Sequence, residues 1–314
     1  MQNTVFRLAT ISLILIAAAG CARDADSTIN EVTISDSPDG TVLAVAEALQ
    51  NDHAEILWTA LPKSYRQDIT EITRAFSEKM DPGVYDRAFA VVMRAIEVID
   101  DRKDIILASE TFKSSGADAD DIRLGLSNTL VFTDILKASD VTTVAGLGSV
   151  DWEQFLATTG NEFIKQAAAI ESPDGDNPFN SLDSLKVETI SVSEDRAMLR
   201  ISSADHEPED VEMAKVEGRW IPAELADDWA RSIEEARQNL AEITPETMAA
   251  QKTQAMMFIG MADGLVEQIA SLQTPEEFDA AIGPMLAPFM GGASMDMGEE
   301  EEWEITEEEA PEEE

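Results

Sequence analysis

Few residues in this chain have the types and spacing that enzyme chemistry needs. Cys21 is the one cysteine, and His53 and His206 are the two histidines. A zinc site usually needs three or four protein ligands, and these two histidines are not accompanied by further ligands at a recognisable spacing. We therefore expect structural or solvent-exposed roles for both, His53 within a helix and His206 in a hairpin loop. The chain also lacks the Gly-x-Ser-x-Gly, His-Glu-x-x-His and phosphate-loop motifs, so we predict no catalytic residue, cofactor or metal ligand.

Acidic residues provide no specific signal for catalysis or metal binding. With 63 Asp and Glu residues, carboxylate pairs arise by chance along the whole chain. The run Asp174-Gly175-Asp176-Asn177 is similar to the start of a calcium loop. However, Phe179 stands where that loop needs glycine, and Leu185 stands where it needs a bidentate glutamate. We expect a turn there, with an irregular calcium site as the alternative.

Methionines gather towards the C-terminus. Thioether sulfur suits Cu(I), so a copper site is one interpretation. The preferred one is that the earlier methionines and Met285 fill gaps in the core, while the last two belong to the tail. The residues concerned are Met256, Met257, Met261, Met285, Met290, Met295 and Met297.

The chain begins with the pattern of a signal peptide. After Arg7, the uncharged stretch 8–20 is rich in Ile, Leu and Ala, and it is shorter than the roughly 20 residues that a membrane-spanning helix needs. It closes with Ala18-Ala19-Gly20-Cys21, which resembles the lipobox of bacterial lipoproteins. The resemblance implies cleavage before Cys21 and attachment of acyl chains such as palmitate to that residue. The alternative is an ordinary secretory leader with a coincidental cysteine.

The residues around Cys21 also bear on location. More than one acyl chain on Cys21 would provide stable anchoring, and a single thiol leaves no partner for an intramolecular disulfide. In lipoproteins of this type an Asp directly after the cysteine favours the inner membrane. Here Ala22 follows, so the resemblance implies the periplasmic face of the outer membrane.

The net charge excludes some partners. The chain carries 22 Lys and Arg against 63 Asp and Glu, a formal charge of -41. Nucleic acid is therefore excluded as a natural partner, and anionic lipid headgroups would repel the body, so the membrane is contacted through the lipid. Such acidity is typical of surfaces that salt keeps soluble. Weak divalent-cation sites are the alternative explanation.

Periodicity predicts an α+β fold that is predominantly α. An acidic tether over 21–40 ends in the turn Ser37-Pro38-Asp39-Gly40. Apolar residues at helical spacing then predict three amphipathic helices, over about 42–56, 65–80 and 85–99, and short connections predict antiparallel neighbours. The second and third begin near Pro62 and Asp81-Pro82, a fourth runs from about Asp118 to Ala138, and a fifth begins at the capping residue Asp151.

The pattern changes to alternation over 184–222, which predicts an antiparallel meander of three or four strands. Its end, Gly218-Arg219-Trp220-Ile221-Pro222, resembles the closing hairpin of small exported domains of the nuclear transport factor 2-like group. That resemblance covers about forty residues and implies no pocket here, because many more helices surround this sheet. The stretch Trp58–Phe89 is similar to segments of uncharacterised exported bacterial proteins, which implies no activity.

Helices resume after the sheet. One carries an apolar stripe from Leu225 to Leu240, another starts at Thr244-Pro245, and a last one opens at Thr274-Pro275-Glu276-Glu277 and frays at Pro284 and Pro288. Together these patterns predict one helical body, 41–293, with the sheet inserted into it.

The last segment, 294–314, is predicted to be a disordered acidic tail. From Asp296 onward it holds 12 acidic residues and no basic one. Trp303 and Ile305, set among these acids, could form a docking segment for a basic partner; a plain solvated tail is the simpler interpretation.

Two classes of function follow from these features. The first is a noncatalytic interaction or scaffold protein, anchored to the outer membrane through Cys21 and binding a periplasmic protein. The second is a binding module for a lipid or another small apolar ligand, which would need a well-formed cavity. We prefer the first, because the sequence shows no convergent polar residues that would orient a ligand.

Overall fold

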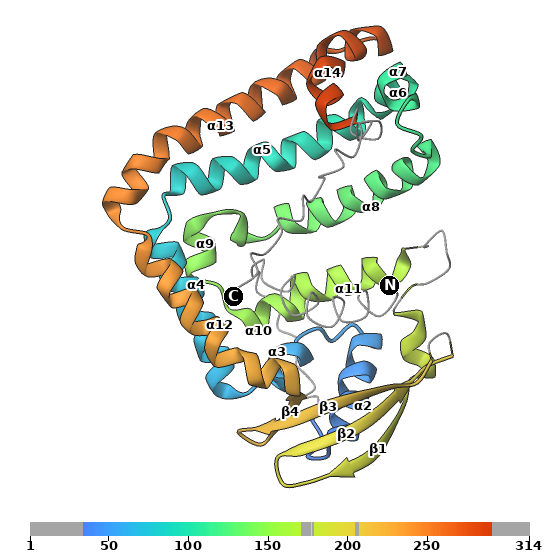
Figure 1. Cartoon of the computed structure of the whole chain (residues 1–314), viewed down its shortest axis with the longest axis vertical. Helices are drawn as coiled ribbons and strands as arrows, with labels where there is room; N and C mark the ends of the chain where they lie inside the picture. The colour runs from blue at the N-terminus through green and yellow to red at the C-terminus, as the bar shows by residue number, and fades with distance from the viewer. Residues whose placement is uncertain (1–33, 171–176, 178, 205–206, 291–314) are drawn as a thin grey trace, which may run out of the picture.

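The computed structural model describes residues 34–170, 177, 179–204 and 207–290. It confirms an α+β fold that is predominantly α, with one four-stranded antiparallel sheet (Figure 1). The α-helices are α2 (Pro38–Gln50), α3 (Ile56–Ala60), α4 (Lys63–Lys79), α5 (Pro82–Asp101), α6 (Lys103–Ala108), α7 (Glu110–Lys113), α8 (Ala119–Lys137), α9 (Val144–Gly148), α10 (Trp152–Phe155), α11 (Asn161–Ala169), α12 (Ala223–Glu242), α13 (Pro245–Ser271) and α14 (Pro275–Met290). The 3₁₀ turns η1 (Asp140–Thr142) and η3 (Asn180–Ser184) and the π-helical turn η2 (Leu156–Gly160) complete the helical elements.

The predicted meander is confirmed. Its strands are β1 (Lys186–Val192), β2 (Arg196–Ser202), β3 (Glu209–Val216) and β4 (Arg219–Pro222), and they pair in the order β1-β2-β3-β4. Alternate side chains of the inner strands are buried in a cluster that Val42 of α2 joins, and Leu199 at its centre is fully buried. The Trp220 indole N–H donates to the Asp36 carbonyl (2.8 Å). The sheet is thus stabilised on one face by helices, as a sheet of this size requires.

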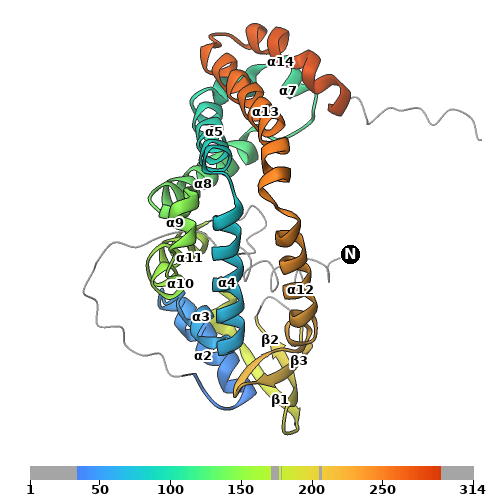
Figure 2. The same cartoon turned by 90° about the vertical axis from the view of Figure 1, so that its left-hand side faces the viewer.

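Two long helical segments, α4–α5 and α12–α13, run side by side in the same direction (Figure 2). Tyr65 stacks on Trp229 near the start of this pairing, and the Arg102 side chain donates to the Ala270 carbonyl near its end. The expectation that short connections make neighbouring helices antiparallel is wrong for α4 with α5. Each connection bends the chain at a proline instead of reversing it, so the neighbours of these helices come from a distant part of the sequence.

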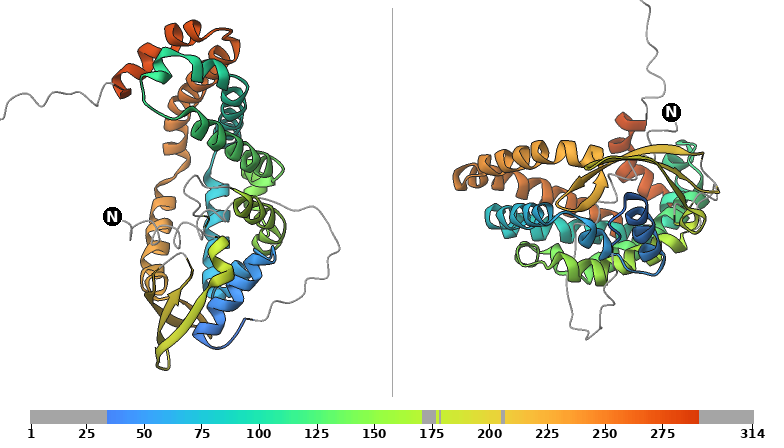
Figure 3. Two further views of the ribbon diagram at one scale, coloured as in Figure 1. Left: turned by 90° about the vertical axis from the view of Figure 1, so that its right-hand side faces the viewer. Right: turned by 90° about the horizontal axis from the view of Figure 1, so that it is seen from below.

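Antiparallel packing does occur in the next layer. Helix α8 runs opposite to α5, with Lys137 paired to Glu97 and Arg123 to Asp104. Seen from below, the molecule has three layers: α12–α13 with the sheet, α4–α5, and α8 with α11 (Figure 3).

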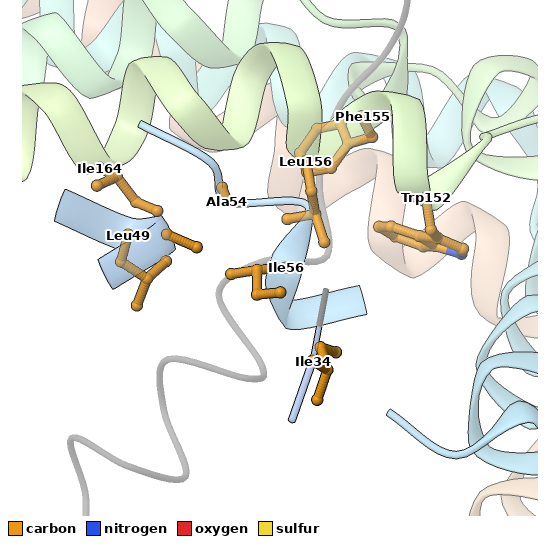
Figure 4. Packing of buried hydrophobic residues seen from close by; sticks show 9 residues of the cluster. Ile34, Leu49, Ala54, Ile56, Trp152, Phe155, Leu156 and Ile164 are labelled. Atoms are coloured by element: carbon orange, nitrogen blue, oxygen red, sulfur yellow. The ribbon is translucent and has the colours of Figure 1, made fainter. Parts of the chain in front are cut away.

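The main apolar core lies where α2, α3, α10 and α11 meet (Figure 4). Phe155 and Ile56 are almost completely buried there, and Ile34, before the first described helix, belongs to the same cluster. The folded body therefore begins before residue 41. The predicted tether up to residue 33 and the tail from residue 291 lie outside the described residues.

Two predictions at the start of the body are wrong. Ser37-Pro38-Asp39-Gly40 begins α2 and is not a turn, because the Ser37 hydroxyl accepts a hydrogen bond from the Gly40 N–H and Pro38 takes the first helical position. The first predicted helix also stops early. Helix α2 ends at Gln50, and Asp52, with φ of 60°, turns the chain so that Ile56 belongs to the separate helix α3.

The other predicted helix starts are confirmed. Asp81, Asp118 and Asp151 each accept a backbone N–H in the first turn of α5, α8 and α10. Thr244 and Thr247 form a reciprocal capping box at α13. The predicted fraying of the last helix is wrong, because α14 continues through Pro284 and Pro288 to Met290.

Candidate binding surfaces

Most residues that the sequence marked for chemistry fall outside the described part. This holds for Cys21, His206 and the run 174–176, so the structure does not place them. His53 is described, and it lies in the turn between α2 and α3 instead of inside a helix. Its Nδ1 is 2.8 Å from Glu55 Oε1. His53 therefore has a local, structural partner.

Asn177 also has a structural role. Its side-chain N–H groups donate to the carbonyls of Ala167, Ala168 and Ile170, and its Oδ1 accepts from the Phe179 N–H. These bonds tie Asn177 to the last turn of α11, where the Ala167 carbonyl also accepts from the Ile170 N–H. Among the described residues, no three His, Cys, Asp or Glu side chains come close enough together to hold a metal ion.

The expectation that the methionines of α13 fill the core is wrong for two of them. Met257 and Met261 are 55% and 63% exposed, and Phe258 beside them is 54% exposed. They form an apolar patch on the outer side of α13. Met295 and Met297, which we assigned to the tail and which the alternative copper site would use, lie outside the described residues.

The clearest candidate site is a groove along one side of α4, which we call the cationic groove. It has a volume of about 460 Å³. Its side chains recur every three or four positions, so they share one face of the helix. They are Lys63, Arg66, Gln67, Thr70, Glu71 and Arg74, with Trp58 of α3 at one end.

Positive charge is concentrated in this groove, although the chain is strongly acidic. Lys63, Arg66 and Arg74 have no carboxylate within 4 Å among the residues that the structure describes. Glu71, the one acid of the groove, accepts from the Gln67 amide (2.7 Å) and lies 3.6 Å from Arg237 of α12. The three cations therefore form no ion pair in the described structure and can contact an external anion, although the charge of Lys63 also acts on the nearby Glu217 carboxylate.

Arg66 differs from the other two cations in its burial. Lys63 and Arg74 are exposed, whereas Arg66 is half-buried. Its Nε–H is buried and has no hydrogen-bond partner in the described part of the chain. A buried donor without an acceptor costs free energy, and a nearby anionic charge would offset part of the cost of burying this cation.

The β3–β4 hairpin sets the electrostatics at the start of the groove. Glu217 and Gly218 form its tight turn with φ of 51° and 81°, and this turn places Glu217 Oε2 3.1 Å from the Ser64 N–H. Hydrogen bonds from Ser64 and the charge of Lys63 lower the pKa of the Glu217 carboxyl. The hairpin thus supplies the N-terminal cap that Pro62 cannot give to α4.

An apolar hollow lies on a different side of α4, with a volume of about 450 Å³. It is open to solvent. Trp152 links it to the groove, because the Trp152 and Trp58 ring centres are 6.3 Å apart. The Trp152 indole N–H is buried without a described partner. The lining residues are Ile72, Thr73, Phe76, Leu147, Trp152, Ala236, Asn239, Leu240 and Ile243.

Sequence reasoning missed the cationic groove. Apolar spacing predicts the stripe of α4 from Tyr65 to Met80, but it gives no role to the opposite face of the helix. A signal was available, since Lys63, Arg66 and Arg74 share a helical face in a chain with few bases. Spacing does not predict that these three basic side chains form no ion pair with an acid of another described element.

None of the described helices is both long enough and apolar enough to cross a membrane. The comparisons with known proteins add no relative: no protein-family model, no curated protein and no solved structure matches this chain.

Proposed function

We propose that this chain is a noncatalytic interaction protein that is anchored by a lipid on Cys21 to the periplasmic face of the outer membrane and binds an anionic partner. The observation that supports the binding role best is the cationic groove, where three basic side chains line one helix face without carboxylate partners in the described structure. The anchor is supported by the motif Ala18-Ala19-Gly20-Cys21.

The anchor is tested by Cys21→Ser. We expect this variant to move from the membrane fraction to the soluble fraction and to lose incorporation of labelled palmitate, because the acidic body has little affinity of its own for anionic lipid. Ala22→Asp in the otherwise unchanged chain is a sorting control and should shift the protein towards the inner membrane. Membrane association that survives Cys21→Ser would contradict the proposed anchor.

The interaction role is tested by crosslinking in intact cells. A photoreactive residue at Gln67, on the exposed rim of the groove, should capture a periplasmic protein. The same residue at Arg231, on the exposed face of α12, is the control. Equal capture at both positions, or none at Gln67, would argue against a partner at the groove.

A second candidate function is binding of a small apolar ligand in the hollow of α4, α9 and α12. The lining by Phe76, Trp152 and Leu240 favours it. However, the hollow is open, whereas typical sites of this kind enclose most of the ligand surface. Fluorescent fatty-acid analogues should bind the wild type and lose affinity in Leu240→Glu; no saturable binding would exclude this function.

A further inference from the structure

We propose that the C-terminal acidic segment of this chain, residues 299–314, binds in the cationic groove of the same molecule. The groove is the side of α4 lined by Lys63, Arg66 and Arg74. The inference rests on the groove being a binding site, as proposed above, and it does not depend on the lipid anchor.

The spacing of the basic residues favours an extended ligand over a compact anion. Lys63 and Arg74 are eleven positions apart, which corresponds to about 16 Å along a helix. A single phosphate or carboxylate group is too small to reach both ends of that row. An extended peptide rises about 3.3 Å per residue, so roughly five residues would follow the groove.

Charge complementarity points to the chain's own C-terminus. From Glu299 to Glu314 the sequence has 11 acidic residues and no basic one, and these acids come in short runs. Arg guanidinium groups pair with carboxylates in a planar geometry, and neither Arg66 nor Arg74 forms an ion pair in the described structure.

The chain is long enough to reach. Helix α14 ends at Met290 and packs on α6 and α7, beyond the far end of α5 (Figure 1). The path back spans the 20 residues of α5 and part of α4, about 45 Å at the helical rise. The 24 residues after Met290 span at most about 80 Å when extended. Some fourteen residues, 291–304, would cover the distance, which leaves 305–314 over the groove; the acids of this stretch lie within Glu307–Glu314.

Tethering makes this contact effective although each pair is weak. Exposed ion pairs contribute little individually, but a segment on the same chain is present at an effective concentration near the millimolar range. Docking of this kind would make the segment an internal competitor, which an anionic partner must displace to occupy the groove.

Zero-length carbodiimide crosslinking of the purified full chain at low salt tests the proposal. This reagent joins an ammonium group to a carboxylate that is in contact with it. We expect crosslinks from Lys63 to Glu307–Glu314, found by mass spectrometry in the monomer. Lys165 and Lys186, which are exposed and outside the groove, should give none to this segment.

The double variant Arg66→Gln/Arg74→Gln keeps Lys63 and should reduce the crosslink yield about tenfold, because two charge-assisted contacts are lost. Arg123→Gln/Arg231→Gln removes the same charge from exposed positions elsewhere and is the matched control. Circular dichroism and thermal melting of each variant separate loss of binding from loss of folding.

Three results would overturn the proposal: crosslinks spread evenly over the exposed lysines, an unchanged yield in Arg66→Gln/Arg74→Gln, or crosslinks found only in dimers. The last result would show that the segment binds a second copy of the chain. If Lys63 in cells crosslinks to another protein and not to this segment, the further inference fails while the proposed interaction function stands.

Discussion

The two long helical segments meet in two chemically different ways along their length. In the lower region, as drawn in Figure 1, α4 and α12 pack mainly through aromatic rings. Tyr65 and Trp229 stack with centres 3.9 Å apart and planes 2° from parallel, beside the buried Leu61 and Ile221. One arginine of α12, Arg237, adds ion pairs to Asp68 and Glu71 of α4. In the upper region, polar contacts are prominent between α5 and α13. The ion pairs there are Arg94 with Asp263 and Glu267, Arg87 with Asp263, and Lys252 with Asp81.

This difference predicts unequal stability along one continuous pair of helices. Burial of aromatic surface is insensitive to salt and to mild acid, whereas exposed ion pairs are weak, are screened by salt and depend on ionised carboxylates. The lower region also holds the main apolar cores around α2 and the sheet. We therefore expect the upper region to open at a lower free energy than the lower one.

The largest effect is expected for Trp229→Ala. This change removes the ring that stacks on Tyr65 and the indole N–H that donates to Asp68 Oδ2 (3.0 Å). The free energy of unfolding should fall by about 3 kcal/mol, at the lower end for aromatic truncation because Trp229 is half-buried. Urea unfolding measures it. Tyr65→Phe keeps the stack and should change little; equal losses in both variants would contradict the stacking explanation.

A smaller effect is expected for Arg94→Gln, which removes the pairs with Asp263 and Glu267 in the upper region. The melting temperature should fall at low salt, and the difference from the wild type should shrink as salt rises, because screening weakens the same pairs in the wild type. Trp229→Ala should keep its full deficit at all salt concentrations. A deficit of Arg94→Gln that is independent of salt would remove the contrast between the two regions.

The pH dependence of stability tests the lower region at Glu217, whose pKa is lowered by the hydrogen bonds from Ser64 and by the charge of Lys63. A lowered pKa in the folded state contributes stability above the ordinary pKa of about 4.5, and this contribution is lost as pH falls through the folded-state value. Glu217→Gln should thus melt lower than the wild type near about pH 7 and converge with it below about pH 3. Thermal melts across this range test it, and parallel pH curves would contradict the capping role.

The smallest effect is expected for Lys252→Gln. Its partner Asp81 already caps α5 through the Val84 N–H, and the Lys252 ammonium, 2.7 Å from Asp81 Oδ2, is largely exposed. The melting temperature should fall only slightly, and hydrogen exchange should speed up at the start of α13 without a change in β2 and β3. Faster exchange in the sheet would show that the two regions open together.

Sequence patterns predicted individual elements well where the signal is local. The caps Asp81, Asp118 and Asp151 each act within three residues, and the alternation over 184–222 reports one buried and one exposed face of the same strands. Local signals were misleading where the same residues are typical of two different structures. Ser37-Pro38-Asp39-Gly40 suits a turn and a helix start equally; in the structure it caps α2, which packs against the sheet.

The sequence by itself determined the acidic charge, the predominance of helices, the meander and the motif around Cys21, because each depends on composition or on neighbours within one element. Tertiary structure decided what depends on distant residues. Glu217 caps α4 across 153 positions, Tyr65 stacks on Trp229, and no described carboxylate lies within 4 Å of the cationic nitrogens of Lys63, Arg66 and Arg74. Neither periodicity nor composition carries such information, since these contacts arise only when remote segments pack together.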